Sequence, residues 1–152
     1  MKITFGKYKG KTVEYLMINQ PDYIKWILIE HEPSGDLAAI QKQVSKLIRK
    51  FDKKPFIGKS CSSSNCNNSA TKFTICKSNL NPHWWCNSCE PIHADITSEQ
   101  LQSPVSYKSA IKHVDRYCNK QTFAYKSIIT MIAEAKGLSA NANELKLIMF
   151  FR

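Results

Sequence analysis

The clearest pattern in the sequence is a helical repeat of apolar residues in the second quarter of the chain. Apolar side chains recur there at steps of three and four residues, which places them on one face of an α-helix. This face consists of Leu37, Ile40, Val44, Leu47, Ile48 and Phe51. Ser34 or Asp36 can cap the start of the helix, and Pro55 ends it. We expect the apolar face to pack on the segment that precedes it.

The segment before this helix predicts a strand, a turn and another helix. Residues 3–5 form a short apolar strand, and the glycines and lysines of residues 6–11 are typical of a turn. Pro21 and Asp22 then open a helix that extends to residue 29, because proline is favoured at the first helical position.

Two further helices are predicted in the C-terminal third. Ser103 and Pro104 provide a cap and a first turn. The apolar face that follows consists of Tyr107, Ala110, Ile111, Val114 and Cys118. The next helix begins near Thr122 and stops at Gly137. Its apolar face consists of Tyr125, Ile128, Ile129, Ile132 and Ala135.

Together these elements predict an α+β fold in three segments. Residues 1–55 form a small basic strand-turn-helix unit, residues 56–100 a central zinc-ribbon-like β-hairpin, and residues 101–152 a helical C-terminal region. The secondary structure of residues 142–151 has two alternatives, a helix or a strand. A capping-box pattern with Glu144 favours a helix, whereas the continuous apolar run favours a strand.

The middle segment carries two closely spaced pairs of cysteines. Four residues separate Cys61 from Cys66, two separate Cys86 from Cys89, and nineteen lie between the pairs. Two such pairs on tight turns can hold one tetrahedral Zn²⁺ ion. Four thiolates close the coordination shell and leave no position for an activated water, so we predict a structural zinc ion.

Other residues near these pairs leave alternatives open. His83 or His93 could replace one cysteine as a ligand. Cys76 and Cys118 lie outside the spacing, and we expect them in apolar packing.

The strand predicted before Cys86 contains two consecutive tryptophans, Trp84 and Trp85. Consecutive strand residues point to opposite faces, so at most one of them fills the small core of the hairpin. The other is either exposed, where its ring can stack on a base, or docked on a neighbouring helix. We count Trp84 among the candidate nucleic-acid-binding residues.

The net charge of +10 is concentrated in the two ends of the chain. Residues 1–55 contain 11 Lys/Arg and 6 Asp/Glu, and residues 104–152 contain 8 and 3, whereas residues 56–103 contain 3 of each. Two flanks of +5 predict a polyanionic partner such as nucleic acid, although lysines also serve solubility. The start of the sequence lacks the apolar core of a signal peptide, and no stretch is long enough to span a bilayer. We therefore expect an intracellular, cytoplasmic protein without a membrane partner.

Two groups of basic residues are candidates for nucleic-acid contact. In the turn, Lys7, Lys9 and Lys11 alternate, so an extended hairpin would place them on one face with Tyr8 on the other. Such lysines contact phosphates and read no base, which predicts weak sequence preference. The second group lies on the predicted helix after residue 34 and consists of Lys46, Arg49 and Lys50.

The turn and the helix that follows it resemble the exodeoxyribonuclease X-like C-terminal module. That family has a basic "FGKYKGK" turn followed by a "DPxYLxWL" helix. Here the turn is Phe5-Gly6-Lys7-Tyr8-Lys9-Gly10-Lys11, and the helix begins with the reversed order Pro21-Asp22. The resemblance covers about residues 3–30. It implies an accessory nucleic-acid-binding role for Lys7, Lys9, Lys11, Tyr8 and Trp26.

The family module also occurs in small stand-alone proteins, many from phages, and no exonuclease domain accompanies it here. The 12 acidic residues are scattered, so we expect no enzymatic activity. The sequence thus predicts a non-catalytic, zinc-containing nucleic-acid-binding accessory protein. The alternative is a small regulator that docks on a host protein, and a nuclease is the least favoured reading. The choice between DNA and RNA, the strand form and the oligomeric state stay open.

Overall fold

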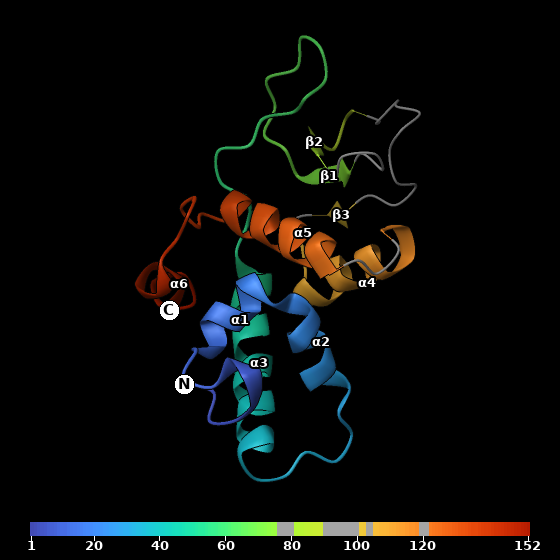
Figure 1. Cartoon of the computed structure of the whole chain (residues 1–152). Coiled ribbons are helices and arrows are strands. Elements are labelled where there is room, and N and C mark those ends of the chain that lie inside the picture. The colour runs from blue at the N-terminus through green and yellow to red at the C-terminus, as the bar shows by residue number, and fades with distance from the viewer. Residues whose placement is uncertain (76–80, 90–100, 103–104, 119–121) are drawn as a thin grey trace.

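A computed structural model describes residues 1–75, 81–89, 101–102, 105–118 and 122–152. The chain has the predicted α+β fold: along the sequence helices come before and after a small antiparallel sheet, and in space the sheet lies at one end of the helices (Figure 1). The helices are α1 (Val13–Asn19), α2 (Pro21–Ile29), α3 (Gly35–Lys53), α4 (Tyr107–Tyr117), α5 (Thr122–Ala135) and α6 (Glu144–Phe150). The strands are β1 (Lys72–Ile75), β2 (Pro82–Trp85) and β3 (Leu101–Gln102).

The helices of the first and last segments share one hydrophobic core. Buried residues from Ile3 to Phe151 form a single cluster, and α1 contacts α2, α3, α5 and α6. Phe51 of α3 lies at its centre, with its ring 5.3 Å from that of Tyr107 and 6.3 Å from that of Phe150. In Figure 1 the helices form one body, and the strands lie beyond α5 at one end of it. Segments that are far apart in the sequence therefore fold together.

The predicted pattern of helices is largely confirmed. α2 and α5 begin where expected, and α3 buries Ile40, Val44 and Phe51 against α1 and α2. α3 begins after Ser34, although no side-chain hydrogen bond caps it. Helix α4 begins later than predicted, after Ser106, whose hydroxyl oxygen accepts a hydrogen bond from the Ser109 amide at 3.0 Å. The cap predicted at residues 103–104 lies outside the described residues.

The end of the chain, which the sequence left open, is a helix. Asn143 caps α6 by accepting a hydrogen bond from the Lys146 amide at 3.0 Å. Glu144 does not close a capping box but accepts a hydrogen bond from the Thr12 amide at 3.1 Å. Hydrogen bonds from Thr12 lower the pKa of the Glu144 carboxyl. The C-terminal helix is thus fastened to the start of α1.

The N-terminal segment differs from the prediction in two ways. The strand expected at residues 3–5 is reduced to a single bridge between Lys2 and Thr12, and Gly6–Tyr8 form a turn of 3₁₀ helix. Gly6 and Gly10 have φ values of 67° and 87°, which turn the chain back on itself. Successive side chains in such a turn do not alternate between two faces, so the extended hairpin on which the one-face arrangement of the lysines depended is wrong.

Helix α1 was not predicted from the sequence. Its seven residues are too few for a clear periodic signal, and all but two are buried. The Thr12 hydroxyl oxygen caps it by accepting a hydrogen bond from the Tyr15 amide at 3.2 Å. Four neighbouring helices stabilise it, rather than its own helix propensity.

A buried lysine joins the ends of α3 and α5. Lys136 is 2% exposed, and its Nζ donates hydrogen bonds to the carbonyl oxygens of Phe51 at 3.1 Å and Lys54 at 2.5 Å. These carbonyls lie at the C-terminal end of α3, where a cation is favoured. Burial nevertheless lowers the pKa of the Lys136 ammonium to about 8.

Lys136 should make stability depend on pH above neutrality. Its pKa is about 8 in the folded protein against an ordinary value of 10.5, so the unfolded chain binds more protons between these two values. The free energy of unfolding should therefore rise with pH across this window. Urea unfolding at pH 8 and pH 10 measures the change, and the rise in the free energy of unfolding between these pH values should be smaller for Lys136→Met than for the parent. An equal rise in the free energy of unfolding for both proteins would show that Lys136 does not titrate in this range.

Candidate metal centre and nucleic-acid interface

The four paired cysteines converge at one end of the small sheet. The sulfur atoms of Cys61, Cys66, Cys86 and Cys89 all lie within 4.8 Å of one another, and the cysteines are not paired in disulfides. The sulfurs of Cys66 and Cys86 are 3.8 Å apart. A tetrahedral ion with metal–sulfur bonds of about 2.3 Å places its ligands about 3.8 Å from one another. The cluster therefore has the dimensions of a four-thiolate metal site.

The local fold explains why the cysteines meet. In the first loop the Cys61 amide donates to the Asn68 carbonyl at 2.9 Å, and the Cys66 amide donates to the Ser63 carbonyl at 3.2 Å. Asn65, with a φ of 60°, turns the chain between the two cysteines. The second pair follows β2 directly. A hydrogen bond of 2.7 Å from the Ser62 amide to the Trp84 carbonyl holds the first loop beside that strand.

The hairpin predicted between the cysteine pairs is present. β1 pairs with β2 in antiparallel register, from Lys72 opposite Trp85 to Ile75 opposite Pro82. A third strand, β3, pairs with the other edge of β1 and was not predicted. Its two residues are too short a pattern to recognise in a sequence.

The surroundings of the cluster favour a thiolate at Cys86. Burial raises the pKa of this thiol, but hydrogen bonds from the amides of Ser88 and Cys89 and from the Asn68 side chain outweigh it, and the pKa falls to about 6. The Ser63 hydroxyl lowers the pKa of Cys89, whereas the neighbouring sulfurs raise it to about 12. The hydrogen bonds between the sulfurs thus favour a protonated Cys89 beside a deprotonated Cys86, whereas a bound cation would favour the thiolate form of all four cysteines.

The two tryptophans of β2 point to opposite faces, as predicted. Trp85 is buried against the cysteine cluster, and its indole Nε1 donates to the Thr74 hydroxyl at 3.0 Å. Trp84 is only partly buried on the other face, where its ring lies 5.1 Å from that of Phe56 and 5.2 Å from that of Phe73. Trp84 is therefore docked rather than freely exposed, which was the second of the two alternatives. Its ring contacts Phe56, which precedes the sheet, and Phe73 of β1, rather than a helix.

The histidine alternative for the metal site is not supported where the structure can test it. Among the described residues the metal-ligating cluster consists of the four cysteines alone, and the His83 ring instead stacks 6.3 Å from that of Trp85. His93 and Cys76 lie outside the described residues. Cys118 is partly buried at the end of α4, and burial raises the pKa of its thiol.

An α+β fold whose hairpin ends in a four-cysteine cluster defines a protein with a zinc-ribbon-like segment. Its N-terminal part matches a known family: residues 3–32 match the profile described as Exodeoxyribonuclease X-like C-terminal, which covers about a fifth of the chain. No curated protein and no solved structure matches the chain.

The family match spans the glycine-lysine turn (residues 6–11) and α2. Lys7, Lys9 and Lys11 are exposed on this turn. The Lys7 ammonium lies 4.8 Å from the centre of the Tyr8 ring, and that of Lys11 lies 4.9 Å from the Tyr15 ring. Each of these two lysines therefore rests on an aromatic ring instead of extending freely into solvent.

The turn and α2 together build a row of aromatic rings, which we call the aromatic row: Tyr8, Tyr23 and Trp26. The rings of Tyr8 and Tyr23 meet edge to face at 4.8 Å, and those of Tyr23 and Trp26 stack at 5.2 Å. The Tyr8 hydroxyl donates to the Gln20 side chain at 2.6 Å, which fixes the first ring. Trp26 ends the row and is 41% exposed.

Sequence analysis did not single out Tyr23 as a functional residue. Its spacing of three residues from Trp26 on a helix was the available signal, because such residues are neighbours on the helix surface. Only the fold shows that Tyr8 joins them.

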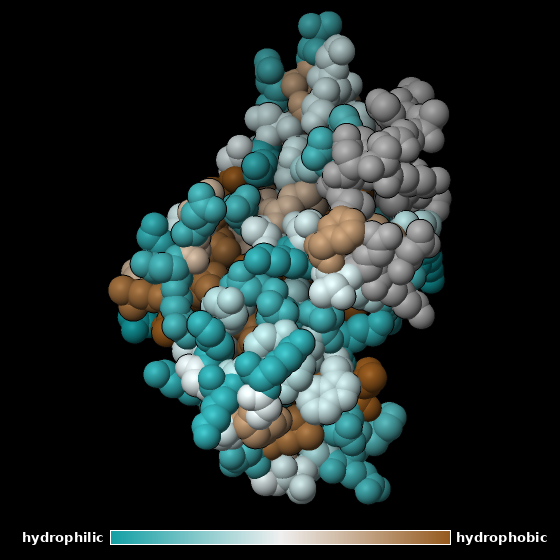
Figure 2. Space-filling model, in the orientation of Figure 1, coloured by the Kyte–Doolittle hydropathy of each residue, from teal (hydrophilic) through white to brown (hydrophobic). Residues whose placement is uncertain are grey.

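The second predicted basic group lies on α3, a different element. Lys46 and Arg49 are exposed there, whereas Lys50 is partly buried and donates to the Arg152 carbonyl at 3.3 Å. Figure 2 shows hydrophilic side chains over most of the helical part of the face that it presents. Within the described ranges, no helix combines the length and apolar character that crossing a membrane requires.

Proposed function

We propose that this protein is a non-catalytic accessory protein that binds single-stranded nucleic acid through its glycine-lysine turn and α2. The observation that carries the proposal is the aromatic row, which has Lys7 at one end and the exposed Trp26 at the other. Proteins that bind single strands combine cations along the backbone with aromatic rings on which bases stack. The family match supports the proposal because it spans both elements of this surface.

The lysines and the tryptophan of this surface would contact different parts of the nucleic acid. Lys7, Lys9 and Lys11 would contact phosphates, whose positions do not depend on the base. Trp26 would stack on a base, and stacking tolerates any base because each has a π face. Since Tyr23 and Tyr8 already support the Trp26 ring, little side-chain entropy remains to be lost on binding. The sequence preference of this surface should therefore be weak, with either DNA or RNA accepted.

We further propose that the four-cysteine cluster holds one structural zinc ion. Thiolate sulfurs in a tetrahedral set are typical ligands of Zn²⁺. When bound, the ion would cross-link the loop after α3 to the end of β2, and its complete shell of protein ligands would leave no site for catalysis. The sheet is small, so such a cross-link would supply stability that its own core cannot.

Removing the lysines of the turn tests the electrostatic part of the proposal. Replacement of Lys7, Lys9 and Lys11 by glutamine should flatten the dependence of log K on log salt by about 2 units, because each single-strand phosphate contact contributes about 0.7. Affinity at 0.1 M salt should fall about 100-fold, and similarly for unrelated sequences. Fluorescence anisotropy with labelled oligonucleotides at several salt concentrations measures both.

The matched control removes three exposed lysines elsewhere, Lys108, Lys112 and Lys146. It loses the same charge, so a slope that flattens equally in both variants would show that net charge, not the turn, drives binding. A turn variant that binds as well as the parent would refute the proposal.

Removing the exposed ring tests the preference for single strands. Trp26→Ala should weaken binding to single strands by about 5- to 150-fold, the range that corresponds to the loss of one stacked base, and should change duplex binding much less. Phe123→Ala is the control, since Phe123 is a 60% exposed aromatic residue outside the family match. Equal effects of Trp26→Ala on single strands and duplexes would contradict stacking.

A groove between α2 and α4 favours a second candidate function, a regulator that docks on an acidic host protein. It is lined by Leu28, Ile29 and Ile111 together with Lys108, Lys112 and the ion pair between Lys25 and Asp115, and Ile29 is 59% exposed. Apolar residues edged by cations suit an acidic amphipathic segment. This candidate gains support if neither the parent nor the variants bind nucleic acid at physiological salt.

A further inference from the structure

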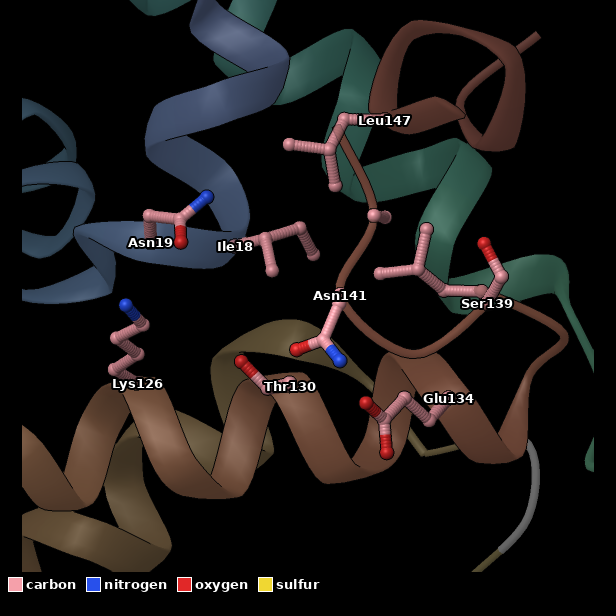
Figure 3. Close-up of a pocket in the computed structure, with 10 residues that line it drawn as sticks. Ile18, Asn19, Lys126, Thr130, Glu134, Ser139, Asn141 and Leu147 are labelled. Carbon is pink, nitrogen blue, oxygen red and sulfur yellow. The ribbon is translucent and has the colours of Figure 1, made fainter. Parts of the chain in front are cut away.

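A small hollow lies between the end of α1, one face of α5 and the loop that leads to α6 (Figure 3). Its volume is about 180 Å³. Ile18, Leu138 and Leu147 contribute apolar surface, and all three are buried. Polar side chains surround this apolar part, a combination typical of sites that bind small molecules.

The polar side chains come from three separate parts of the chain. Asn19 ends α1, Lys126, Thr130 and Glu134 follow one another along α5, and Ser139 and Asn141 come from the loop. In Figure 3 the polar ends of Asn19, Lys126, Thr130 and Asn141 face the space between α1 and α5. The set offers two amides, two hydroxyls, an ammonium and a carboxylate, so it can both donate and accept hydrogen bonds.

One of these groups lacks a partner. The Thr130 hydroxyl has almost no contact with solvent and makes no hydrogen bond to any described residue. A buried hydroxyl without a partner is unfavourable, and such groups call for a functional explanation. A bound molecule that accepted or donated a hydrogen bond here would remove the penalty.

The size of the hollow limits the molecule that fits. An apolar cavity of about 150 Å³ admits one benzene ring. A hollow of about 180 Å³ therefore accommodates a single six-membered ring with small substituents, and the two fused rings of a purine fit less well.

The hollow adjoins the proposed nucleic-acid interface. Asn19 is followed by Gln20, whose side chain accepts the hydrogen bond of Tyr8 in the aromatic row. Consecutive Cα atoms are about 3.8 Å apart, so a residue that lines the hollow directly precedes one that contacts the aromatic row.

We propose that the hollow binds one pyrimidine base of a strand bound on the aromatic row, with cytosine preferred, an inference that rests on the proposed function. The apolar residues contact the ring, and Glu134, which is exposed at the edge of the hollow, accepts a hydrogen bond from the cytosine amino group, for which uracil and thymine have an acceptor instead. Lys126 lies eight residues before Glu134 on α5, about 12 Å along the helix axis. It is therefore placed to neutralise the phosphate of the same nucleotide.

The test is titration of the ¹⁵N-labelled protein with the 5′-monophosphates of cytidine, uridine, adenosine and guanosine, followed by NMR. The side-chain amide signals of Asn19 and Asn141 should shift with cytidine monophosphate, less with uridine monophosphate and least with the purines. No shift with any of them at millimolar concentration, or equal shifts with purines, would overturn the inference.

Two variants test whether cytidine monophosphate binds in the hollow. Thr130→Val keeps the shape of the side chain and should weaken the binding of cytidine monophosphate about tenfold. It should not lower the melting temperature, because the hydroxyl has no partner to lose. Glu134→Gln should reduce the preference for cytosine over uracil. Ser127→Ala, which removes an exposed hydroxyl from the same helix outside the hollow, is the control and should bind as the parent does.

Oligonucleotides distinguish this inference from the proposed function. Oligocytidylate should bind more tightly than oligoadenylate, and Thr130→Val should reduce this difference in affinity. If oligocytidylate binds through the turn but the difference is unchanged in Thr130→Val, the hollow has no part in recognition and only the proposed function stands. If cytidine monophosphate shifts the amides but no oligonucleotide binds, the proposed function fails, and the inference of a strand-borne base fails with it.

Discussion

Replacement of Cys86 by serine is expected to abolish binding of the proposed zinc ion and to unfold the segment around the small sheet. Its sulfur lies 3.8 Å from that of Cys66, and Trp85 packs directly on the cluster. Metal binding at a structural site is largely folding energy, on the order of 10 kcal/mol. Elemental analysis should find one zinc per parent chain and almost none in the variant. The amide NMR signals of residues 60–75 and 81–89 should collapse toward random-coil positions.

The helical body should survive this change. The cysteine cluster and Trp85 form a hydrophobic cluster of their own, and of the strands' fully buried side chains only Phe73 and Ile75 of β1 belong to the core that the helices share, so the helices keep most of that core. Circular dichroism should therefore show most of the helix signal retained. Cys118→Ser is the matched control, because this thiol lies at the end of α4 and outside the cluster, and it should keep the metal. A parent protein purified without chelators that contains no zinc would refute the metal site.

Replacement of Phe51 by alanine is expected to lower the free energy of unfolding by about 3–5 kcal/mol, the usual cost of removing a buried phenylalanine. Phe51 is 0% exposed, and its ring meets Tyr107 of α4 as well as Phe150 and Phe151 at the end of the chain. The loss should affect α3, α4 and α6 together, since all of them contact this ring. Urea unfolding followed by circular dichroism measures the change.

The result also tests whether the two ends of the chain unfold as a unit. A variant in which α4–α6 keep the parent's stability while α1–α3 lose theirs would contradict a shared core. Phe123→Ala again serves as the control. Its ring is 60% exposed, so its removal should change stability by less than about 0.5 kcal/mol.

Periodic patterns in the sequence were sufficient where an element is long or chemically distinctive. The stripe from Ile40 to Phe51 predicted α3, because a 19-residue amphipathic helix repeats its pattern several times. The spacing of Cys61, Cys66, Cys86 and Cys89 predicted the cluster, because two tight turns joined by a hairpin bring the pairs together whatever surrounds them.

Two short elements could not be predicted from periodic patterns. Helix α1 has seven residues and β3 has two, so neither repeats a pattern often enough to be recognised. The turn at Gly6–Tyr8 shows alternating lysines in the sequence, yet positive φ angles at Gly6 and Gly10 remove the extended geometry that the alternation suggested. Local composition identified a turn but not its type.

The sequence by itself determined the class of the fold, the longer helices, the four-cysteine cluster and the basic character of the N-terminal turn. These features depend on residues close together in the chain, whose spacing constrains local geometry directly. Only the tertiary structure decided that Tyr8 meets Tyr23, that Lys136 caps α3 and that Asn19 and Asn141 border one hollow. Such contacts join residues 15 to more than 100 positions apart, and they arise because the helices of both ends must bury their apolar faces in one core.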